Sequence, residues 1–352
     1  MRRSPRLSFR KKLLFYLLYF TATPLLILFI AEVTARLIGY KAWNPEQPKT
    51  ITVEPGGKFF MKHPTLGYTH IPGQFKITLS GAYTFRATNL ENTLRITHPL
   101  NTYHAEGAKP QIWIFGDSIT YGESVNDEET YPWLLQERFP DYEIVNFGAQ
   151  GYGTLQSLIQ LREALQRGDK PKLAIIAYAS FHDVRNTFIR LRRKMIVPAE
   201  YLGPLNQPYA RLGSDGKLEI FMDSSEFREF PLMRYSAFIN ALEEAYDRYE
   251  ERHSRSHEVT KAIIKEFSDL CKANGVELVV ASLTSDQTTY DMLNYCRSEG
   301  IKTADMWVDY INVKENNNMP YDSHPSAIAH RQYAQKLESF LRDGIISDSP
   351  SN

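Results

Sequence analysis

Residues 111–118, QIWIFGDS, decide the fold class of this chain. A short apolar run ends there in glycine, aspartate and serine, and similar runs recur further along. The apolar runs span 112–115, 142–147, 173–178, 276–283 and, more weakly, 303–307. Helical stretches separate them at 132–138, 155–167, 232–273 and 286–298, and a last one follows at 326–341. Apolar strands that alternate with helices are typical of a parallel sheet covered on both faces. We therefore predict an α/β domain over 108–345, followed by a tail at 346–352.

The segment before this domain has a different character. Prolines and glycines recur through 40–107 and exclude a long helix. Residues 75–88, FKITLSGAYTFRAT, alternate in polarity and predict a β-hairpin across Ser80 and Gly81. We expect 40–107 to form an extracytoplasmic lead-in. Within the α/β domain, 186–231 interrupts the alternation, and we expect an insert over the carboxyl edge of the sheet.

The N-terminus carries a membrane signal. Leu13 to Ala31 is nineteen residues without a charge, and a helix of that length spans roughly 28 Å, close to a hydrocarbon core. The preceding tail, 1–12, holds six basic residues and no acid. This bias predicts a single-pass anchor over 13–33, with the N-terminus cytoplasmic and the catalytic domain outside, in the periplasm or at the cell surface. A cleaved signal peptide is the alternative, although its apolar region would be shorter.

Charge and cysteine content exclude several classes of protein. The chain has 41 basic and 41 acidic residues. Removing the six basic residues of the tail leaves 35 against 41, or about −6, so binding of nucleic acid through phosphate neutralisation is not expected. Cys271 and Cys296 are too few for a cysteine-built zinc site, although a single disulfide stays open. His253 and His257 could share a helix face but lack an evident third ligand, so a metal site is not expected there. No cofactor is expected either.

Ligands bind outside the carboxyl ends of parallel strands, and polar motifs occur at these places. Ser118 follows the first strand, where a helix entrance would expose its hydroxyl, although a serine there can also act only as an N-cap. Residues 146–153, NFGAQGYG, follow the second strand and let backbone amides approach a ligand. Their spacing is not that of a dinucleotide or phosphate loop.

Two further motifs complete the set. His324 can take a proton from a serine hydroxyl, and Asp322 can hold the other ring nitrogen. The same residues could instead form a turn before the last helix. Residues 182–186, HDVRN, offer polar donors after the third strand. Each motif alone has an ordinary structural explanation, but together they supply a nucleophile, oxyanion donors, a base and an orienting acid.

Three blocks in this order resemble the SGNH/GDSL hydrolase family. FGDSITYG at 115–122 is similar to its nucleophile block, NFGAQGYG to its glycine block, and YDSHPS at 321–326 to its histidine block. The stretch after the serine is also similar to membrane-anchored bacterial members. The resemblance implies a flavodoxin-like three-layer α/β/α sandwich. It implies Ser118 as nucleophile, the amides of Ser118 and Gly151 as oxyanion donors, and His324 as base.

The chain departs from this family at two positions. The third block is usually Gly-x-Asn-Asp, whereas here it is Ser180-Phe181-His182-Asp183, so His182 would have to donate a ring N–H to the oxyanion. The family's aspartate usually lies three residues before the histidine, where this chain has Tyr321. Asp322 is therefore the expected orienting acid, with Asp305 as the alternative.

The expected function is a serine esterase that hydrolyses an acyl ester of a glycan or lipid through an acyl-serine intermediate. The substrate is expected to contact Asp117, Asp183, Arg185 and Asn186, and Arg185, Arg190 and Arg192 could meet an anionic group. An O-acyltransferase acting on a cell-surface glycan is a second hypothesis. A third is a module that binds a glycan or acyl chain without catalysis, because the fold does not choose among these functions.

Overall fold

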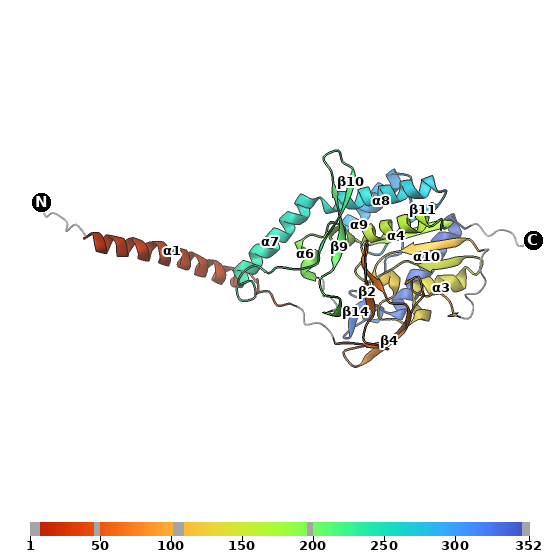
Figure 1. Ribbon diagram of the computed structural model, residues 1–352, viewed down its shortest axis with the longest axis horizontal. Helices are drawn as coiled ribbons and strands as arrows, with labels where there is room; N and C mark the ends of the chain where they lie inside the picture. Colours follow the sequence, from red (N-terminus) through yellow and green to blue (C-terminus); the bar gives the residue numbers. More distant parts are fainter. Residues whose placement is uncertain (1–7, 46–49, 101–108, 196–199, 347–352) are drawn as a thin grey trace, which may run out of the picture. The chain divides into compact units, whose positions relative to one another are not determined.

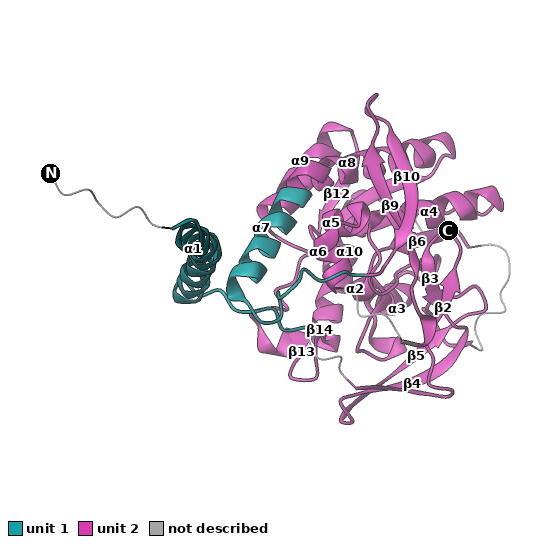
Figure 2. Cartoon of the chain, turned by 60° about the vertical axis from the view of Figure 1, so that its left-hand side comes forward, with its two compact units in different colours: residues 1–47, 227–250 teal, residues 48–226, 251–352 magenta. Residues whose placement is uncertain are grey.

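The computed structural model describes residues 8–45, 50–100, 109–195 and 200–346, which fall into two compact units (Figure 2). One unit combines the N-terminal part up to 47 with 227–250, and the other contains the rest. Residues 50–100 of the predicted lead-in and the described α/β domain other than 227–250 therefore belong to one unit. The predicted boundary at 107–108 lies outside the described residues, as do most of the two predicted terminal tails.

A five-stranded parallel sheet forms the centre of the larger unit (Figure 1). Its strands are β6 (Gln111–Phe115), β7 (Glu143–Asn146), β8 (Leu173–Tyr178), β11 (Glu277–Ser282) and β12 (Lys302–Asp305). Their spatial order is β12-β11-β8-β6-β7, and every neighbouring pair is parallel. Counted along the chain this is the order 2-1-3-4-5 of flavodoxin-like sheets. The predicted fold class is confirmed.

Helices cover both faces of the sheet because successive side chains of a strand point to opposite sides. Trp113 and Phe115 pack on one side, in a core that includes residues of three helices: α4 (Thr154–Gln166), α8 (Ser256–Ala273) and α9 (Gln287–Ser298). Ile112 and Ile114 pack on the other, with residues of α3 (Tyr131–Arg138) and α10 (Ala327–Gly344). The result is the three-layer sandwich.

The lead-in consists of short antiparallel elements. A three-stranded sheet has the order β1-β4-β5 and contains β1 (Ile51–Glu54), β4 (Gly73–Leu79) and β5 (Tyr83–Asn89). A separate hairpin is formed by β2 (Phe60–His63) and β3 (Gly67–His70). The β4–β5 connection lies where the sequence predicts a turn, and Ser80 and Gly81 both have positive φ, of 51° and 66°.

The remaining elements of this unit surround the sheet. The predicted insert at 186–231 is built of the end of α5 (His182–Thr187), α6 (Arg190–Met195), η3 (Glu200–Leu202) and the hairpin of β9 (Asn206–Leu212) and β10 (Leu218–Ser224); residues 196–199 lie outside the described ones. The short elements are α2 (Ser118–Tyr121), η2 (Asp127–Glu129), η4 (Lys314–Asn316), β13 (Asn317–Asn318) and β14 (Asp322–Pro325). Cys271 and Cys296 are buried free thiols, so the disulfide that the sequence left open is not formed.

The smaller unit contains α1 (Phe9–Leu37) and most of α7 (Ala237–Ser254). The most apolar 18-residue window of α1 has a mean hydropathy of 2.2 and none of it is buried. Its length and composition suit a membrane span, and a signal sequence meets the same criterion. Near the end of α1, Glu32 caps α7 by accepting hydrogen bonds from the amides of Ala237 and Phe238, both at 3.0 Å.

Candidate active site

Ser118 and His324 meet at the carboxyl edge of the sheet. Ser118 begins α2 directly after β6, and Asp117 caps this helix because its Oδ1 accepts a hydrogen bond from Ile119 N at 3.0 Å. The strand β14 carries His324, whose Nε2 lies 2.9 Å from Ser118 Oγ. The two residues are 206 positions apart in the chain, so only the fold brings them together.

Asp322 occupies the third place in this hydrogen-bonded chain. Its Oδ2 and Oδ1 lie 3.0 and 3.1 Å from His324 Nδ1. The alternative acid, Asp305, instead accepts hydrogen bonds from Ser282 Oγ and Trp307 N. Asp322 is buried and also accepts a hydrogen bond from Ser124 Oγ, a contact that the sequence did not predict.

A second acid, Glu123, lies beside the imidazole. Its Oε2 is 3.4 Å from His324 Nε2, on the nitrogen that also faces Ser118. Burial alone would lower the pKa of His324, but the charge of Glu123 and the hydrogen bond and charge of Asp322 raise it to about 9. The imidazole is therefore mainly protonated at neutral pH. Sequence analysis missed Glu123, whose only signal is its place five residues after Ser118.

The glycine loop brings backbone amides to the same edge. A Cβ on Gly148 would lie 2.4 Å from the backbone N of Tyr121, so only glycine allows the loop to pack this closely on α2. Gly151 has φ +74°, a conformation that favours glycine. Within the described part of the chain, the amides of Ser118 and Gly151 donate no hydrogen bond to another protein group. Both are available to a ligand.

The lead-in holds the loop that follows Ser118. Arg95 is only 1% exposed, and its guanidinium donates to the carbonyl oxygens of Tyr121, Gly122, Val125 and Arg86. Its Nε also lies 3.0 Å from Asp127 Oδ1, in a buried ion pair. Arg95 thus helps to fix the segment that presents Glu123 to His324 and Ser124 to Asp322.

The lead-in also holds the glycine loop. The hydroxyl of Tyr68 donates to the carbonyl oxygen of Gln150, and His70 Nε2 lies 2.5 Å from Gln150 Oε1. The His70 ring stacks on Tyr121 with centroids 4.3 Å apart. Burial lowers the pKa of His70 to about 4, so this imidazole is neutral and acts as a structural contact.

Residues after the third strand do not all contact the site as predicted. His182 is buried, with Nε2 3.3 Å from Asp117 Oδ2 and Nδ1 3.4 Å from Thr154 Oγ1. Burial lowers the pKa of His182, so the ring is mainly neutral. Both of its nitrogens face these two side chains, and no contact supports the predicted donation to an oxyanion.

Two predicted substrate contacts, Asp183 and Asn186, are buried and hydrogen-bonded to other protein groups. Asn186 is fully buried; its Oδ1 accepts from Leu155 N and its Nδ2 donates to Thr260 Oγ1, both at 2.9 Å. Asp183 is also buried and accepts from the hydroxyl of Tyr178, and its other oxygen lies 2.7 Å from His257 Nδ1. Asn186 thus joins α5 to α4 and α8, and Asp183 joins α5 to β8 and α8.

Asp117 and Arg185 form an ion pair behind the nucleophile. Asp117, a predicted substrate contact, has no exposed surface. Burial alone would raise the pKa of Asp117, but His182 and Arg185 lower it below its ordinary value and keep the carboxylate ionised. Arg185 Nη1 donates to Asp117 Oδ2 at 3.1 Å and to Tyr152 O at 2.8 Å, and 17% of this side chain is exposed. Of these predicted substrate contacts, Arg185 keeps access to solvent.

The structure also shows which groups could hold a metal. Among the described residues, one cluster of three suitable side chains is found, Glu123, Asp322 and His324, with ligand atoms within 4.8 Å of one another. Both nitrogens of His324 already face Ser118 and Asp322, so this cluster is part of the site described above. Outside it, His257 lies between Asp183 and Asp291 and does not share a ligand set with His253.

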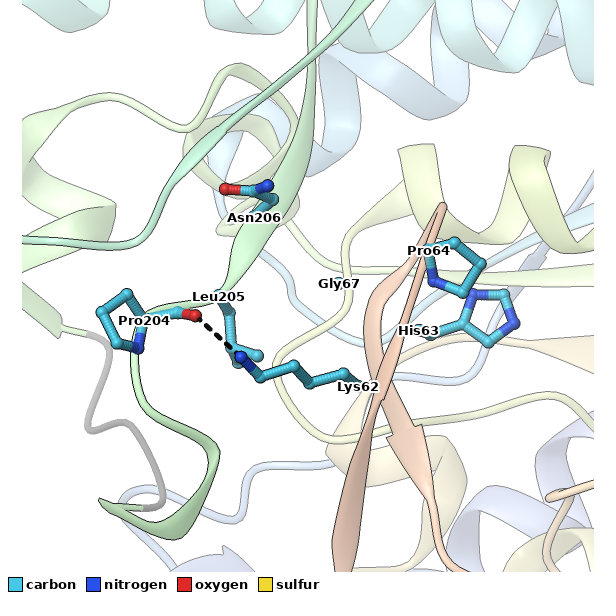
Figure 3. Close-up of a pocket in the computed structure, with 7 residues that line it drawn as sticks. All are labelled: Lys62, His63, Pro64, Gly67, Pro204, Leu205 and Asn206. Carbon is cyan, nitrogen blue, oxygen red and sulfur yellow. Dashed lines mark hydrogen bonds between the residues drawn. The ribbon is translucent and has the colours of Figure 1, made fainter.

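A shallow cavity of about 310 Å³ lies elsewhere, between the β2–β3 hairpin and the start of β9 (Figure 3). Its lining residues are Lys62, His63, Pro64, Gly67, Pro204, Leu205 and Asn206. Lys62 Nζ reaches the carbonyl oxygen of Pro204 at 3.5 Å across it. None of the residues around Ser118 lines this cavity, so we do not identify it with the active site.

Comparison with known proteins finds similarity in solved structures alone. No family model matches the chain, and no curated protein matches its sequence. A putative lipolytic protein of the G-D-S-L family from Desulfitobacterium hafniense is 14% identical, with 66% of this chain and 100% of that chain covered and a TM-score of 0.38. AlinE4, an SGNH-hydrolase family esterase, is 13% identical over 69% of this chain and 100% of its own, with a TM-score of 0.35.

The acetyl xylan esterase Est2A from Butyrivibrio proteoclasticus is also 13% identical. The match covers 86% of this chain and 84% of that one, with a TM-score of 0.36. Because these identities and TM-scores are low, function is inferred from the geometry of this chain's own residues.

Proposed function

We propose that this chain is a serine esterase that hydrolyses an acyl ester through an acyl-serine intermediate. The observation that carries this proposal is the continuous contact from Ser118 Oγ through His324 to Asp322, beside two amides that donate to no other group in the described parts of the chain. A hydroxyl that is only an N-cap would need neither the imidazole nor the acid behind it. The sequence resemblance to SGNH/GDSL hydrolases supports the same assignment.

In the proposed reaction, neutral His324 accepts the proton of Ser118 while Oγ attacks the ester carbonyl. Asp322 holds Nδ1–H and stabilises the imidazolium that forms. The amides of Ser118 and Gly151 donate to the oxyanion of the tetrahedral intermediate. His324 then protonates the departing alcohol. A water molecule then loses a proton to His324 and attacks the acyl-serine carbonyl. When the bond to Ser118 Oγ breaks and the acid leaves, the imidazolium returns that proton to Oγ, which restores the serine hydroxyl and neutral His324.

The proposed location is outside the membrane, with α1 as an anchor. The support is the apolar length of α1 together with the basic residues that precede it in the sequence. An anchored enzyme would act on esters of the cell surface or the membrane, which agrees with the glycan or lipid substrates expected from the sequence.

The test uses the full chain purified in mild detergent, with 4-nitrophenyl acetate as substrate. Wild type should release 4-nitrophenol and be labelled at Ser118 by a fluorophosphonate probe. Ser118→Ala should lose both properties, whereas the control Ser323→Ala, at an exposed residue next to His324, should keep them. Hydrolysis by Ser118→Ala at the wild-type rate would refute the proposal. Absence of labelling in wild type would favour a binding module without catalysis.

A further inference from the structure

Two arginines, Arg185 and Arg192, flank the glycine loop, and Arg192 has no acidic partner among the residues that the structure describes. Arg192 Nη2 donates to Gly151 O at 2.9 Å, and this is its one hydrogen bond among the described residues. The next residue along α6, Arg193, pairs with Asp223 at 2.6 Å, as a surface arginine commonly does. The guanidinium of Arg192 therefore lies against the glycine loop, and no carboxylate among the described residues forms an ion pair with it.

Arg185 adds a second positive charge next to it. Its Nη1 donates to Tyr152 O, the carbonyl of the residue after Gly151. The buried Asp117 pairs with Arg185, and among the described residues Arg192 has no ion pair with a carboxylate. Burial, and then repulsion by the nearby positive charge of Arg185, lower the pKa of Arg192 to about 10. A further anion at this place would relieve that repulsion.

Acidic and basic side chains contact different parts of the site around Ser118. The acids Glu123 and Asp322 contact His324, whereas the two arginines contact the loop that carries the proposed oxyanion amide. A negative group of a bound ester would be repelled beside His324 and attracted beside Gly151. Guanidinium groups recognise carboxylate and phosphate oxygens through paired N–H donors, so both ligand types suit this place.

We propose that Arg192 and Arg185 form a subsite for an oxyanion group, a carboxylate or phosphate, carried by the ester substrate next to its scissile carbonyl. The inference rests on the proposed ester hydrolysis at Ser118 and narrows its substrate class to anionic esters. The subsite binds the anionic group through the guanidinium N–H groups that do not contact the loop carbonyls.

The first test compares two 4-nitrophenyl esters of similar acyl length, the anionic hemisuccinate and the neutral butyrate. In wild type we expect kcat/KM for the hemisuccinate to exceed that for the butyrate by about tenfold. One charge-assisted contact typically strengthens binding by about that factor. Arg192→Met should remove this preference and Arg192→Lys should keep part of it. The matched control Arg193→Met, on the same helix, should preserve it. Equal ratios in wild type and Arg192→Met would overturn the subsite.

A second measurement does not depend on hydrolysis. Inorganic phosphate or succinate should raise the Tm of the wild-type full chain and raise it less in Arg192→Met. An equal shift in both proteins, or no shift in wild type, overturns the subsite even if esters are hydrolysed. If neither ester is hydrolysed and Ser118 is not labelled, the proposed function fails, while a phosphate shift that depends on Arg192 would still support an anion site.

Discussion

Glu123→Gln should move the pH dependence of ester hydrolysis to lower pH. The proposed general base is neutral His324, whose pKa is raised to about 9. Below that pH the imidazolium predominates and cannot accept the proton of Ser118, so the wild-type rate should rise with pH through about 9. Glutamine keeps the shape of Glu123 but removes the negative charge 3.4 Å from Nε2. The protonated form of His324 then loses one of its stabilising partners.

The magnitude follows from the distance. Two unit charges 3.4 Å apart attract by about 1.2 kcal/mol with the dielectric of water and about 5 kcal/mol with the value typical of protein surfaces. Since about 1.4 kcal/mol corresponds to one pH unit, the midpoint should fall by about one unit or more. At pH 7 the fraction of neutral imidazole, and with it kcat/KM, should then rise about tenfold in Glu123→Gln.

The assay is kcat/KM for 4-nitrophenyl acetate between pH 6 and 10, corrected for spontaneous hydrolysis. Glu128→Gln is the matched control, because Glu128 pairs with Arg86 at the surface and lies five residues further along, in η2. Its midpoint should stay at the wild-type value. A midpoint in Glu123→Gln that is equal to or higher than that of wild type would refute the electrostatic role of Glu123.

Three further predictions test other parts of the structure. Asp322→Asn should lower kcat on the order of 10³–10⁴-fold, because the asparagine amide cannot stabilise the imidazolium of His324. Asp305→Asn should retain activity, and the reverse result would show that Asp305 is the orienting acid. Arg95→Met should reduce the free energy of unfolding in urea by about 3–5 kcal/mol, because its buried carboxylate partner is left uncompensated, and a loss below about 1 kcal/mol would contradict the structure. Cys271 and Cys296 should resist a thiol reagent in the native protein and both react after denaturation without reductant, whereas a disulfide would prevent that reaction.

The sheet could be predicted from the sequence because its strands carry their own signal. Residues 173–178 are apolar throughout and form β8 within the bounds that were predicted. Parallel strands bring their carboxyl ends to one edge, which is why Ser118 and His324 could be expected to meet. The triad contacts follow from topology more than from the details of any one loop.

The sequence was less informative about which polar residues at a strand end face the site. Helix α5 begins at His182, soon after β8, and directs Asp183 and Asn186 towards partners on other helices. Those partners, His257 and Thr260, lie 74 positions further along the chain, and no local pattern marks them. A polar residue that is buried and satisfied has the same appearance in the sequence as one that lines a site.

Arg95 was missed for a similar reason. Most of its partners are backbone carbonyl oxygens, which every residue possesses and which leave no trace in the sequence. Glu123 belongs to a loop whose course depends on Arg95, so its position next to His324 could not be predicted either. These two residues link the lead-in to the chemistry, and neither belongs to a recognisable block.

Arg95 holds the loop after Ser118, and Tyr68 and His70 hold the glycine loop. These contacts matter for the choice of fragments to express. A shortened version beginning near residue 108 would retain Ser118, His324 and Asp322. It would also lack Arg95, the partner of the buried Asp127 carboxylate, and the contacts that Tyr68 and His70 make with Gln150 of the glycine loop. Fragments intended for crystallisation or activity assays should therefore start before residue 50. Loss of activity in a shorter fragment could result from the missing contacts and would not test the proposed function.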